Sequence, residues 1–172
     1  EQGKNEEAEP LLRESIIIKG KSLGCEHPDY NASLHMLALV LVQQGKFPEA
    51  ERLLRDSLEI IERTLGYNHR EYGVALHRLA SVLTAQEKYP EAERVLRQAL
   101  AIRETSLGRE HPDQAEILHS LANVILKQNR HVEAELLLRK SLALIERTVG
   151  RENPRYSTAL DELAAILALQ GK

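Results

Sequence analysis

Apolar positions along the chain fall into helical patterns, and two such patterns alternate. From Pro28 to Gln44 the apolar residues are three or four positions apart, which is the spacing of one buried face of an α-helix. They are Leu34, Leu37, Ala38 and Leu41. A turn follows at Gly45-Lys46-Phe47, and the same spacing returns between Pro48 and Gly66. The inward positions there are Ala50, Leu53, Leu54, Ser57, Leu58 and Ile61. The pattern predicts two helices joined by a short turn.

Residues at the predicted helix ends suit their positions. Pro28 lies in a first turn, where a backbone N–H would have no partner, and Asp29 complements the helix dipole. Gly66 suits the left-handed backbone position that follows many helices. Histidines precede three of the first helices, and we expect them to serve the loops between repeats. They are His27, His69 and His111.

The helix pair repeats every 42 residues. Gly24, Gly66, Gly108 and Gly150 recur at this spacing, as do the leucines and alanines of both buried faces. A fixed period is typical of stacked repeats. We therefore predict about eight helices and no β-strand, in one domain over residues 1–172. Its parts are a half repeat 1–24, repeats 25–66, 67–108 and 109–150, and a half repeat 151–172. Because residue 1 is not Met, we expect a fragment of a longer protein.

Small residues predict how the helices pack. Ala38 and Ala50 would let the two helices of a pair approach closely, and each pair would bury its remaining apolar face against the next pair. At the two ends of the chain, the faces at Ala8, Leu12 and Ile16 and at Leu163 and Leu167 would stay uncovered. We therefore expect head-to-tail self-association, with Ala164 of one copy packing on Ala8 of another.

Composition and charge narrow the function. The formal net charge of −3 gives no reason to expect nucleic acid, and no apolar run is long enough to cross a membrane. The single cysteine, Cys25, excludes an internal disulfide and favours a reducing compartment, the cytoplasm. A phosphate-binding glycine loop and a nucleophile elbow are both missing from the sequence. We predict a non-enzymatic protein without a cofactor or metal.

The spacing of the apolar and turn positions resembles a known repeat family. Leu34, Leu37, Ala38, Leu41, Gly45, Phe47, Ala50, Leu54 and Ser57 are similar to the tetratricopeptide signature. The long period, with segments such as His27-Pro28-Asp29 and Phe47-Pro48-Glu49-Ala50-Glu51, resembles the extended repeat of kinesin light chains. This resemblance implies a right-handed α-solenoid of stacked antiparallel helix pairs. It also implies a protein–protein interaction scaffold, whose first helices line a concave groove for a partner peptide.

Carried onto this sequence, the resemblance selects ten candidate residues for peptide binding. They are His35, Leu39, His77, Arg78, Ser81, His119, Asn123, Lys127, Asp161 and Glu162. In kinesin light chains an Asn pair commonly grips the peptide backbone. Here the corresponding pairs are His35-Met36, His77-Arg78, His119-Ser120 and Asp161-Glu162. The cargo motifs that kinesin light chains bind are therefore not assigned to this chain.

The recurring histidines His35, His77 and His119 have three interpretations. They could pair with neighbouring side chains, contact a peptide, or bind a metal, although no Cys or carboxylate completes a ligand set at a familiar spacing. If they line the groove, their protonation near pH 6.5 would add positive charge beside Arg78 and Lys127.

Glutamate and arginine recur four residues apart on the second helices. The pairs are Glu9/Arg13, Glu51/Arg55, Glu93/Arg97 and Glu135/Arg139. We expect a solvated face here, since such pairs add only a few tenths of a kcal/mol each. Two functions remain open at this stage: a peptide-binding scaffold, or a regulatory or self-associating repeat arm of a larger signalling protein.

Overall fold

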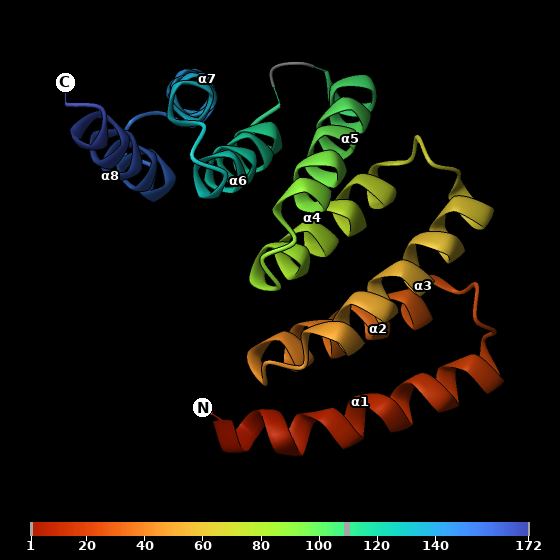
Figure 1. Cartoon of the computed structure of the whole chain (residues 1–172). Coiled ribbons are helices and arrows are strands. Elements are labelled where there is room, and N and C mark those ends of the chain that lie inside the picture. Colours follow the sequence, from red (N-terminus) through yellow and green to blue (C-terminus); the bar gives the residue numbers. More distant parts are fainter. Residues whose placement is uncertain (1, 109–110, 172) are drawn as a thin grey trace. The chain divides into compact units, whose positions relative to one another are not determined.

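The computed structural model describes residues 2–108 and 111–171, which form eight α-helices and no β-strand (Figure 1). This confirms the predicted fold class. The helices are α1 (Gln2–Ser22), α2 (Pro28–Gln43), α3 (Phe47–Leu65), α4 (Arg70–Ala85), α5 (Tyr89–Leu107), α6 (Asp113–Lys127), α7 (His131–Thr148) and α8 (Pro154–Leu169). Helices α2, α4, α6 and α8 are the first helices of the repeats. None of the described helices is long and apolar enough to cross a lipid bilayer.

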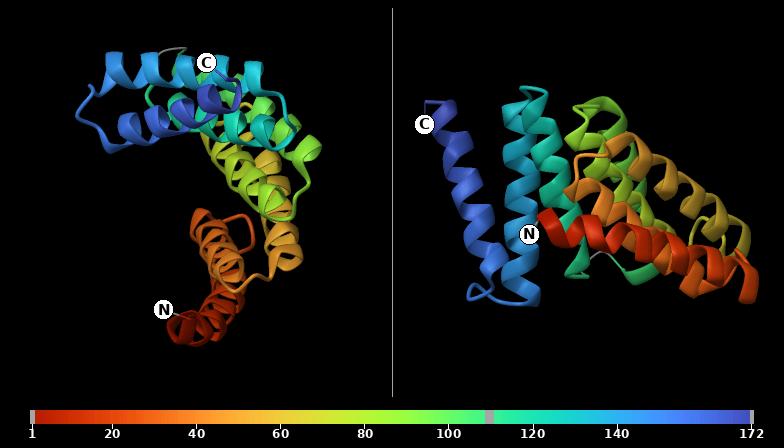
Figure 2. Two further views of the ribbon diagram at one scale, coloured as in Figure 1. Left: turned by 60° about the vertical axis from the view of Figure 1, so that its left-hand side comes forward. Right: turned by 90° about the horizontal axis from the view of Figure 1, so that it is seen from below.

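The chain divides into two compact units, Glu1–Glu87 and Lys88–Lys172. In each unit, substantial packing joins helices that are consecutive in the chain. In the first unit, α2 packs on α1 and α3, and α3 packs on α4. In the second unit, α6 packs on α5 and α7, and α7 packs on α8; Figure 2 shows these last three helices side by side. Each unit is therefore a stack of antiparallel helices.

The alanines expected at close helix contacts are fully buried. Ala38 on α2 and Ala50 on α3 have almost no exposed surface, and the same holds for Ala122 on α6 and Ala134 on α7. Large side chains such as Leu37 and Leu121 fill the space beside them. Small residues at these positions leave room for the facing helix, so the packing derived from the sequence is confirmed.

Histidine caps the first helices. Nδ1 of His27 accepts a hydrogen bond of 3.2 Å from the backbone N–H of Asp29, and His69 and His111 make the equivalent bond with Glu71 and Asp113. Before α8 the side chain of Asn153 takes the same part, accepting from the N–H of Arg155 at 2.9 Å. A side-chain acceptor at this place satisfies an N–H that the helix leaves free. His27 and His69 therefore cap α2 and α4, whereas Asn153 caps α8 and the residue directly before α6 is Pro112.

The glycines after α3 and α5 have a backbone conformation other than the predicted one. Gly66 has φ 83° and ψ 156°, and Gly108 has φ 82° and ψ 160°. These angles lie in an extended region with positive φ, which is essentially restricted to glycine, and not in the left-handed helical region. The expected left-handed helical conformation of Gly66 is therefore wrong. Glycine is nevertheless required, because residues with a side chain almost never adopt the observed angles.

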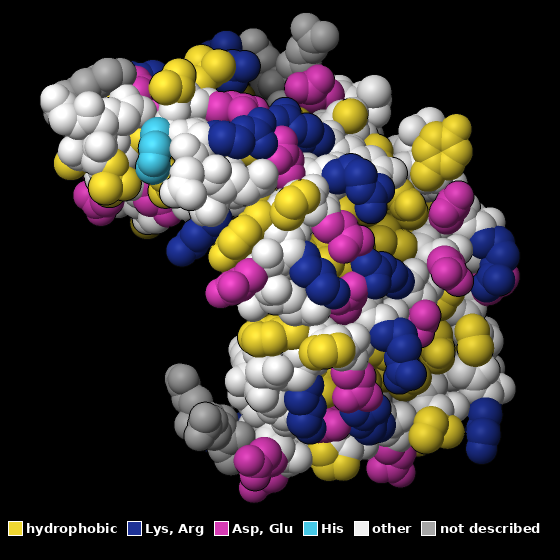
Figure 3. All heavy atoms as spheres, viewed as in Figure 1, with side chains coloured by type: hydrophobic (Ala, Val, Ile, Leu, Met, Phe, Trp, Pro, Cys, Tyr) yellow, Lys and Arg dark blue, Asp and Glu magenta, His cyan; other side chains and the backbone are white. Residues whose placement is uncertain are grey.

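The glutamates of the recurring pairs are partly or fully buried, which corrects the predicted solvated face. All four ion pairs with the arginine one turn later are present, but Glu51 is buried and Glu9, Glu93 and Glu135 expose only about a sixth of their side chains. Figure 3 shows Lys and Arg side chains lying next to Asp and Glu on the face in view. The arginines remain in solvent, while the carboxylates lie against the neighbouring repeat.

These carboxylates connect one repeat to the next. Glu9 accepts a hydrogen bond from Lys46 at 2.7 Å, and Glu51 accepts one from Gln86 at 2.6 Å. Glu93 accepts from Gln128 at 2.9 Å and from Arg130 at 2.7 Å. Each donor lies in or next to the turn after the following first helix. We call this set the inter-repeat glutamate bridges.

The hydrogen bonds of these bridges lower the pKa of the glutamates. Hydrogen bonds from Lys46 and Arg13 lower the pKa of Glu9 to about 2. Burial acts to raise the pKa of Glu93, but hydrogen bonds from Arg97, Gln128 and Arg130 outweigh it and lower the pKa overall. The carboxylates therefore remain ionised while they join neighbouring repeats.

Candidate functional site

Helices α2 and α4 of the first unit border a hollow of about 290 Å³. Its wall is mainly apolar, with Met36, Leu39 and Val42 from α2 and Val82 from α4. Three polar residues also line it, namely His35, Arg78 and Ser81. Four of the predicted groove residues, His35, Leu39, Arg78 and Ser81, therefore share one concave surface.

A second hollow of about 510 Å³ adjoins the first and shares His35, Met36 and Arg78 with it. Its other walls come from the loop before α2, from the first turns of α2, from α3 and from the start of α4. They include Glu26, Asn31, Ala32, Ile60, Thr64 and Glu71. The buried Oδ1 atom of Asn31 has no hydrogen-bond partner among the described residues. Sequence reasoning missed this hollow, because it depends on how α2, α3 and α4 come together.

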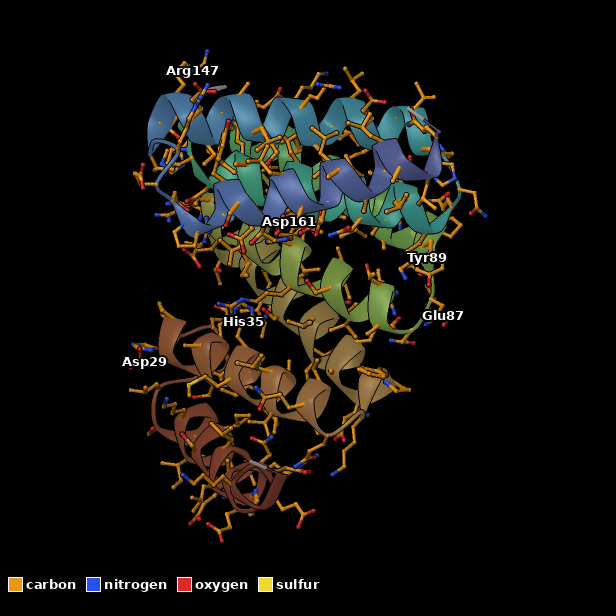
Figure 4. The ribbon with its side chains drawn as sticks, turned by 90° about the vertical axis from the view of Figure 1, so that its left-hand side faces the viewer. Asp29, His35, Glu87, Tyr89, Arg147 and Asp161 are labelled. Atoms are coloured by element: carbon orange, nitrogen blue, oxygen red, sulfur yellow. The ribbon has the colours of Figure 1, made fainter. Side chains whose placement is uncertain are left out.

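His35 lies at the base of both hollows and is only 8% exposed. Its Nε2 shares a hydrogen bond of 2.6 Å with the hydroxyl of the fully buried Ser57 on α3. Burial, with a smaller contribution from the charge of Arg78, lowers the pKa of His35 to about 4. The expectation that His35 becomes charged near pH 6.5 is therefore wrong. Figure 4 labels its position on α2.

The other candidates on α4 lie nearer to solvent. Arg78 and Ser81 are exposed, and His77 is partly buried. The hydroxyl of Ser81 donates to the backbone carbonyl of His77 at 3.2 Å. Arg78 and Ser81 line the first hollow and can contact a molecule that enters it, whereas His77 lines neither hollow.

In the second unit, three candidates form one hydrogen-bonded cluster. Nε2 of His119 on α6 lies 2.7 Å from Oε1 of Glu162 on α8, and Nδ2 of Asn123 lies 3.4 Å from the same oxygen. This pairing supports the interpretation that His119 interacts with a neighbouring side chain. Lys127 and Asp161 lie on α6 and α8, and Figure 4 labels the exposed Asp161. Sequence spacing had placed these residues on one face but could not pair them.

The described residues contain no group of three His, Cys, Asp or Glu side chains that could hold a metal ion. Cys25 is exposed on the loop before α2. The hollows therefore offer apolar contact, hydrogen bonding, the positive charge of Arg78 and, in the second hollow, the carboxylates of Glu26 and Glu71.

Comparison with protein families identifies the architecture. Four overlapping matches to the tetratricopeptide repeat model cover residues 1–63, 29–105, 71–147 and 113–172. The chain belongs to the tetratricopeptide repeat (TPR) family. This family is generally a non-enzymatic fold for protein–protein interaction. Comparison with curated protein sequences gives no match.

Solved structures resemble this TPR array over most of its length. The nearly identical TPR-like repeats from Podosopora anserina, from a protein provisionally described as a kinesin light chain, are 32% identical to it. The similarity covers 98% of this chain and 80% of that one, with a TM-score of 0.82. BtubC (BKLC) of P. vanneervenii is 21% identical over 88% of this chain and 61% of its own, with a TM-score of 0.79. The Yersinia enterocolitica type III secretion translocator chaperone SycD is 17% identical over 85% and 89%, with a TM-score of 0.64. The first similarity shows repeats of the kinesin light chain type, and the other two show the TPR fold.

Proposed function

We propose that this TPR array is a non-enzymatic scaffold that binds a peptide segment of a partner protein on the surface of its first helices. The observation that carries the proposal is the pair of adjoining hollows beside α2 and α4, where Met36 and Leu39 expose apolar surface next to Arg78. Exposed apolar side chains beside a few polar groups are typical of sites that bind peptides. The hollow of about 290 Å³ lies at the lower end of the volumes of ligand pockets, so it suits a side chain of a longer segment.

The experiment that tests this function starts from the purified chain and a library of short random peptides. Peptides that are enriched on the chain are synthesised, and their affinity is measured with Leu39→Lys and with Leu136→Lys. Both leucines are exposed to a similar extent, but Leu136 lies on the second helix α7, outside both hollows. We expect Leu39→Lys alone to reduce affinity by about tenfold or more, as for a central contact of an interface. The proposed site is wrong if both variants bind the peptides as the wild type does.

A second candidate function is self-association through α1 and α8. Leu11 on α1 is 67% exposed, whereas Leu53 at the same repeat position is 9% exposed. Leu160 on α8 is 43% exposed, against 3% for its counterpart Leu34. The exposed faces of α1 and α8 thus differ from the predicted ones. On α1, Ala8, Leu12 and Ile16 are partly covered, and on α8 Leu163 is buried. A second helix of one copy and a first helix of another would together complete a repeat.

Light scattering over a range of concentrations tests the self-association. The contact would be heterologous, so the wild type should form open chains of increasing length. Leu11→Glu and Leu160→Glu should each give monomers alone. An equimolar mixture of the two should give a dimer and nothing larger, since each variant keeps one intact face. A wild type that remains monomeric at high concentration, or variants that behave like it, would exclude this candidate.

A further inference from the structure

Arginines of the second helices also connect one repeat to the next. On α1, Arg13 pairs with Glu9 of its own helix and, at 2.7 Å, with Glu49 of α3, 36 residues further along the chain. In the second unit, Arg97 of α5 pairs with Glu133 of α7 over the same separation and at the same distance. Each of these arginines therefore binds a glutamate in the first turn of the following second helix.

Arg139 on α7 has only half of this arrangement. It pairs with Glu135 of its own helix at 3.0 Å. The next helix is the first helix α8, and the structure describes no second helix after it. The side chain of Arg139 is 55% exposed, against 40% for Arg13 and 47% for Arg97. Its guanidinium is therefore accessible to a carboxylate of another molecule.

The glutamate that matches Arg139 lies on α1. Glu7, Glu49 and Glu133 occupy one repeat position, because they are separated by 42 residues or a multiple of 42. Glu7 is exposed and has no ion-pair partner in the described part of the chain. Leu11 follows four residues later on the same side of the helix and is also exposed. Helix α1 of a second copy thus carries both the acidic and the apolar group that a second helix beside α8 requires.

We propose that α1 of a second copy packs beside α8 in the register of the repeat, and that Arg139 of one copy pairs with Glu7 of the other. This inference rests on the second candidate function, self-association, and adds the charged pair that selects its register. Arg139 then binds two carboxylates, one from its own helix and one from the next second helix, as Arg13 and Arg97 do within the chain.

A second polar pair lies on the same two helices. Asp161 on α8 occupies the repeat position of His35, and Ser15 on α1 occupies that of Ser57. Within the first unit these two positions share a hydrogen bond of 2.6 Å. Asp161 is exposed, Ser15 is partly exposed, and neither has a hydrogen-bond partner in the described part of the chain. Between two copies, the hydroxyl of Ser15 donates to the carboxylate of Asp161.

The charged pair selects one register where apolar contact alone would permit several. A shift of α1 by three residues in one direction would bring the exposed Lys4 opposite Arg139, and like charges at an interface disfavour binding. The same shift in the other direction would bring Pro10 opposite Arg139 and leave the guanidinium without a carboxylate. Only the register of the repeat joins opposite charges.

Charge reversal at the two positions tests this inference by light scattering. Arg139→Glu and Glu7→Arg each place like charges at the contact, and each should weaken association about tenfold or more. An equimolar mixture of the two variants should form chains as long as those of the wild type, because alternating copies join opposite charges at every contact. This rescue would also exclude misfolding as the cause of the weaker association.

Lys140→Glu is the matched control. Lys140 is an exposed cation of the same helix and lies directly after Arg139, but it is not at the repeat position that pairs with glutamate. The variant makes the same change in net charge as Arg139→Glu and should associate within about twofold of the wild type. The difference between Arg139→Glu and the wild type should decrease as salt is added, because salt screens exposed charges.

The possible failures can be told apart. A wild type that remains monomeric at high concentration would overturn both the self-association and this inference. A wild type that associates, with Arg139→Glu and Glu7→Arg equal to it, would overturn the inference while the self-association stands. Equal losses with Arg139→Glu and Lys140→Glu, or a mixture that associates no better than the separate variants, would also overturn the inference.

Discussion

His35 carries a neutral imidazole that is buried against the hydroxyl of Ser57, and this burial links folding to pH. Its pKa of about 4 in the folded chain lies below the value of about 6.5 for a free histidine. Between these values the unfolded chain binds more protons than the folded chain, so stability falls as the pH falls. We expect a loss of about 2 kcal/mol between pH 7 and pH 5, since each pKa unit corresponds to about 1.4 kcal/mol.

Denaturant unfolding of the wild type and of His35→Gln at several pH values measures this effect. The glutamine can still bond to Ser57 but does not titrate. The free energy of unfolding of the wild type should therefore decline relative to that of the variant across this window. Parallel curves for the two proteins would show that His35 is not the group responsible.

The histidine caps of the first helices allow a matched substitution. His69→Ala removes the acceptor for the N–H of Glu71 and should cost about 1 kcal/mol, as for the loss of other N-caps. His69→Asn should retain most of the stability, because Asn153 makes the equivalent bond before α8. Thermal unfolding of the two variants decides between a capping function and a passive loop position. If the alanine variant is as stable as the asparagine variant, the bond contributes nothing.

The alanine position shared by the first helices is buried on α6 but exposed on α8. Ala122 on α6 is fully buried, whereas Ala164 occupies the same position on α8 and is exposed. Replacement of Ala122 by Leu should cost about 1–3 kcal/mol through overpacking. Replacement of Ala164 by Leu should change stability by less than about 0.5 kcal/mol. Chemical denaturation measures both, and equal midpoints would contradict the packing described for α6 and α7.

The inter-repeat glutamate bridges should contribute more than isolated surface ion pairs. Glu93→Ala removes the carboxylate that accepts from Gln128 and Arg130, although Arg130 keeps its bond to Glu133, and we expect a loss of about 1–3 kcal/mol. The control is Glu59→Ala, at an exposed position of α3, which should cost less than about 0.5 kcal/mol. The measurement is the free energy of unfolding in denaturant. A loss for Glu93→Ala no larger than that for Glu59→Ala would show that Glu93 contributes no more to stability than a solvent-exposed glutamate.

The helices and their packing could be predicted from the sequence because the apolar positions repeat with one period. Each buried Leu or Ala, such as Ala38 or Leu121, has counterparts at the same position in the other repeats, and these indicate the same burial. For the candidate site, the sequence predicted only which helix face each residue lies on. The burial of His35 depends on Ser57, 22 residues away on another helix. The bond between His119 and Glu162 spans 43 residues. Such pairings follow from how the helices meet, and the pattern along one helix does not contain them.

Over the whole chain, local stability should follow the number of neighbouring helices. Helices α1 and α8 pack on one described neighbour each, whereas α3 and α7 pack on two. Stability in a repeat array is close to a sum over such nearest-neighbour contacts. We expect amide hydrogens of α1 and α8 to exchange at least about tenfold faster than those of α3 and α7 in the folded protein. Native-state hydrogen exchange followed by mass spectrometry measures this, and uniform protection of all helices would contradict it.

The glutamate bridges also bear on how such an array can change length during evolution. Every bridge spans less than one period: Glu9 to Lys46 and Glu51 to Gln86 are separated by 37 and 35 residues. If recombination within the gene removed residues 25–66, Gln86 and Lys88 would take the places of Gln44 and Lys46, and Glu9 would meet an equivalent lysine. Duplication of one period would likewise supply every new carboxylate with its donor. Whole repeats can therefore be gained or lost without a compensating mutation, whereas a deletion of another length between a carboxylate and its donor breaks that bridge.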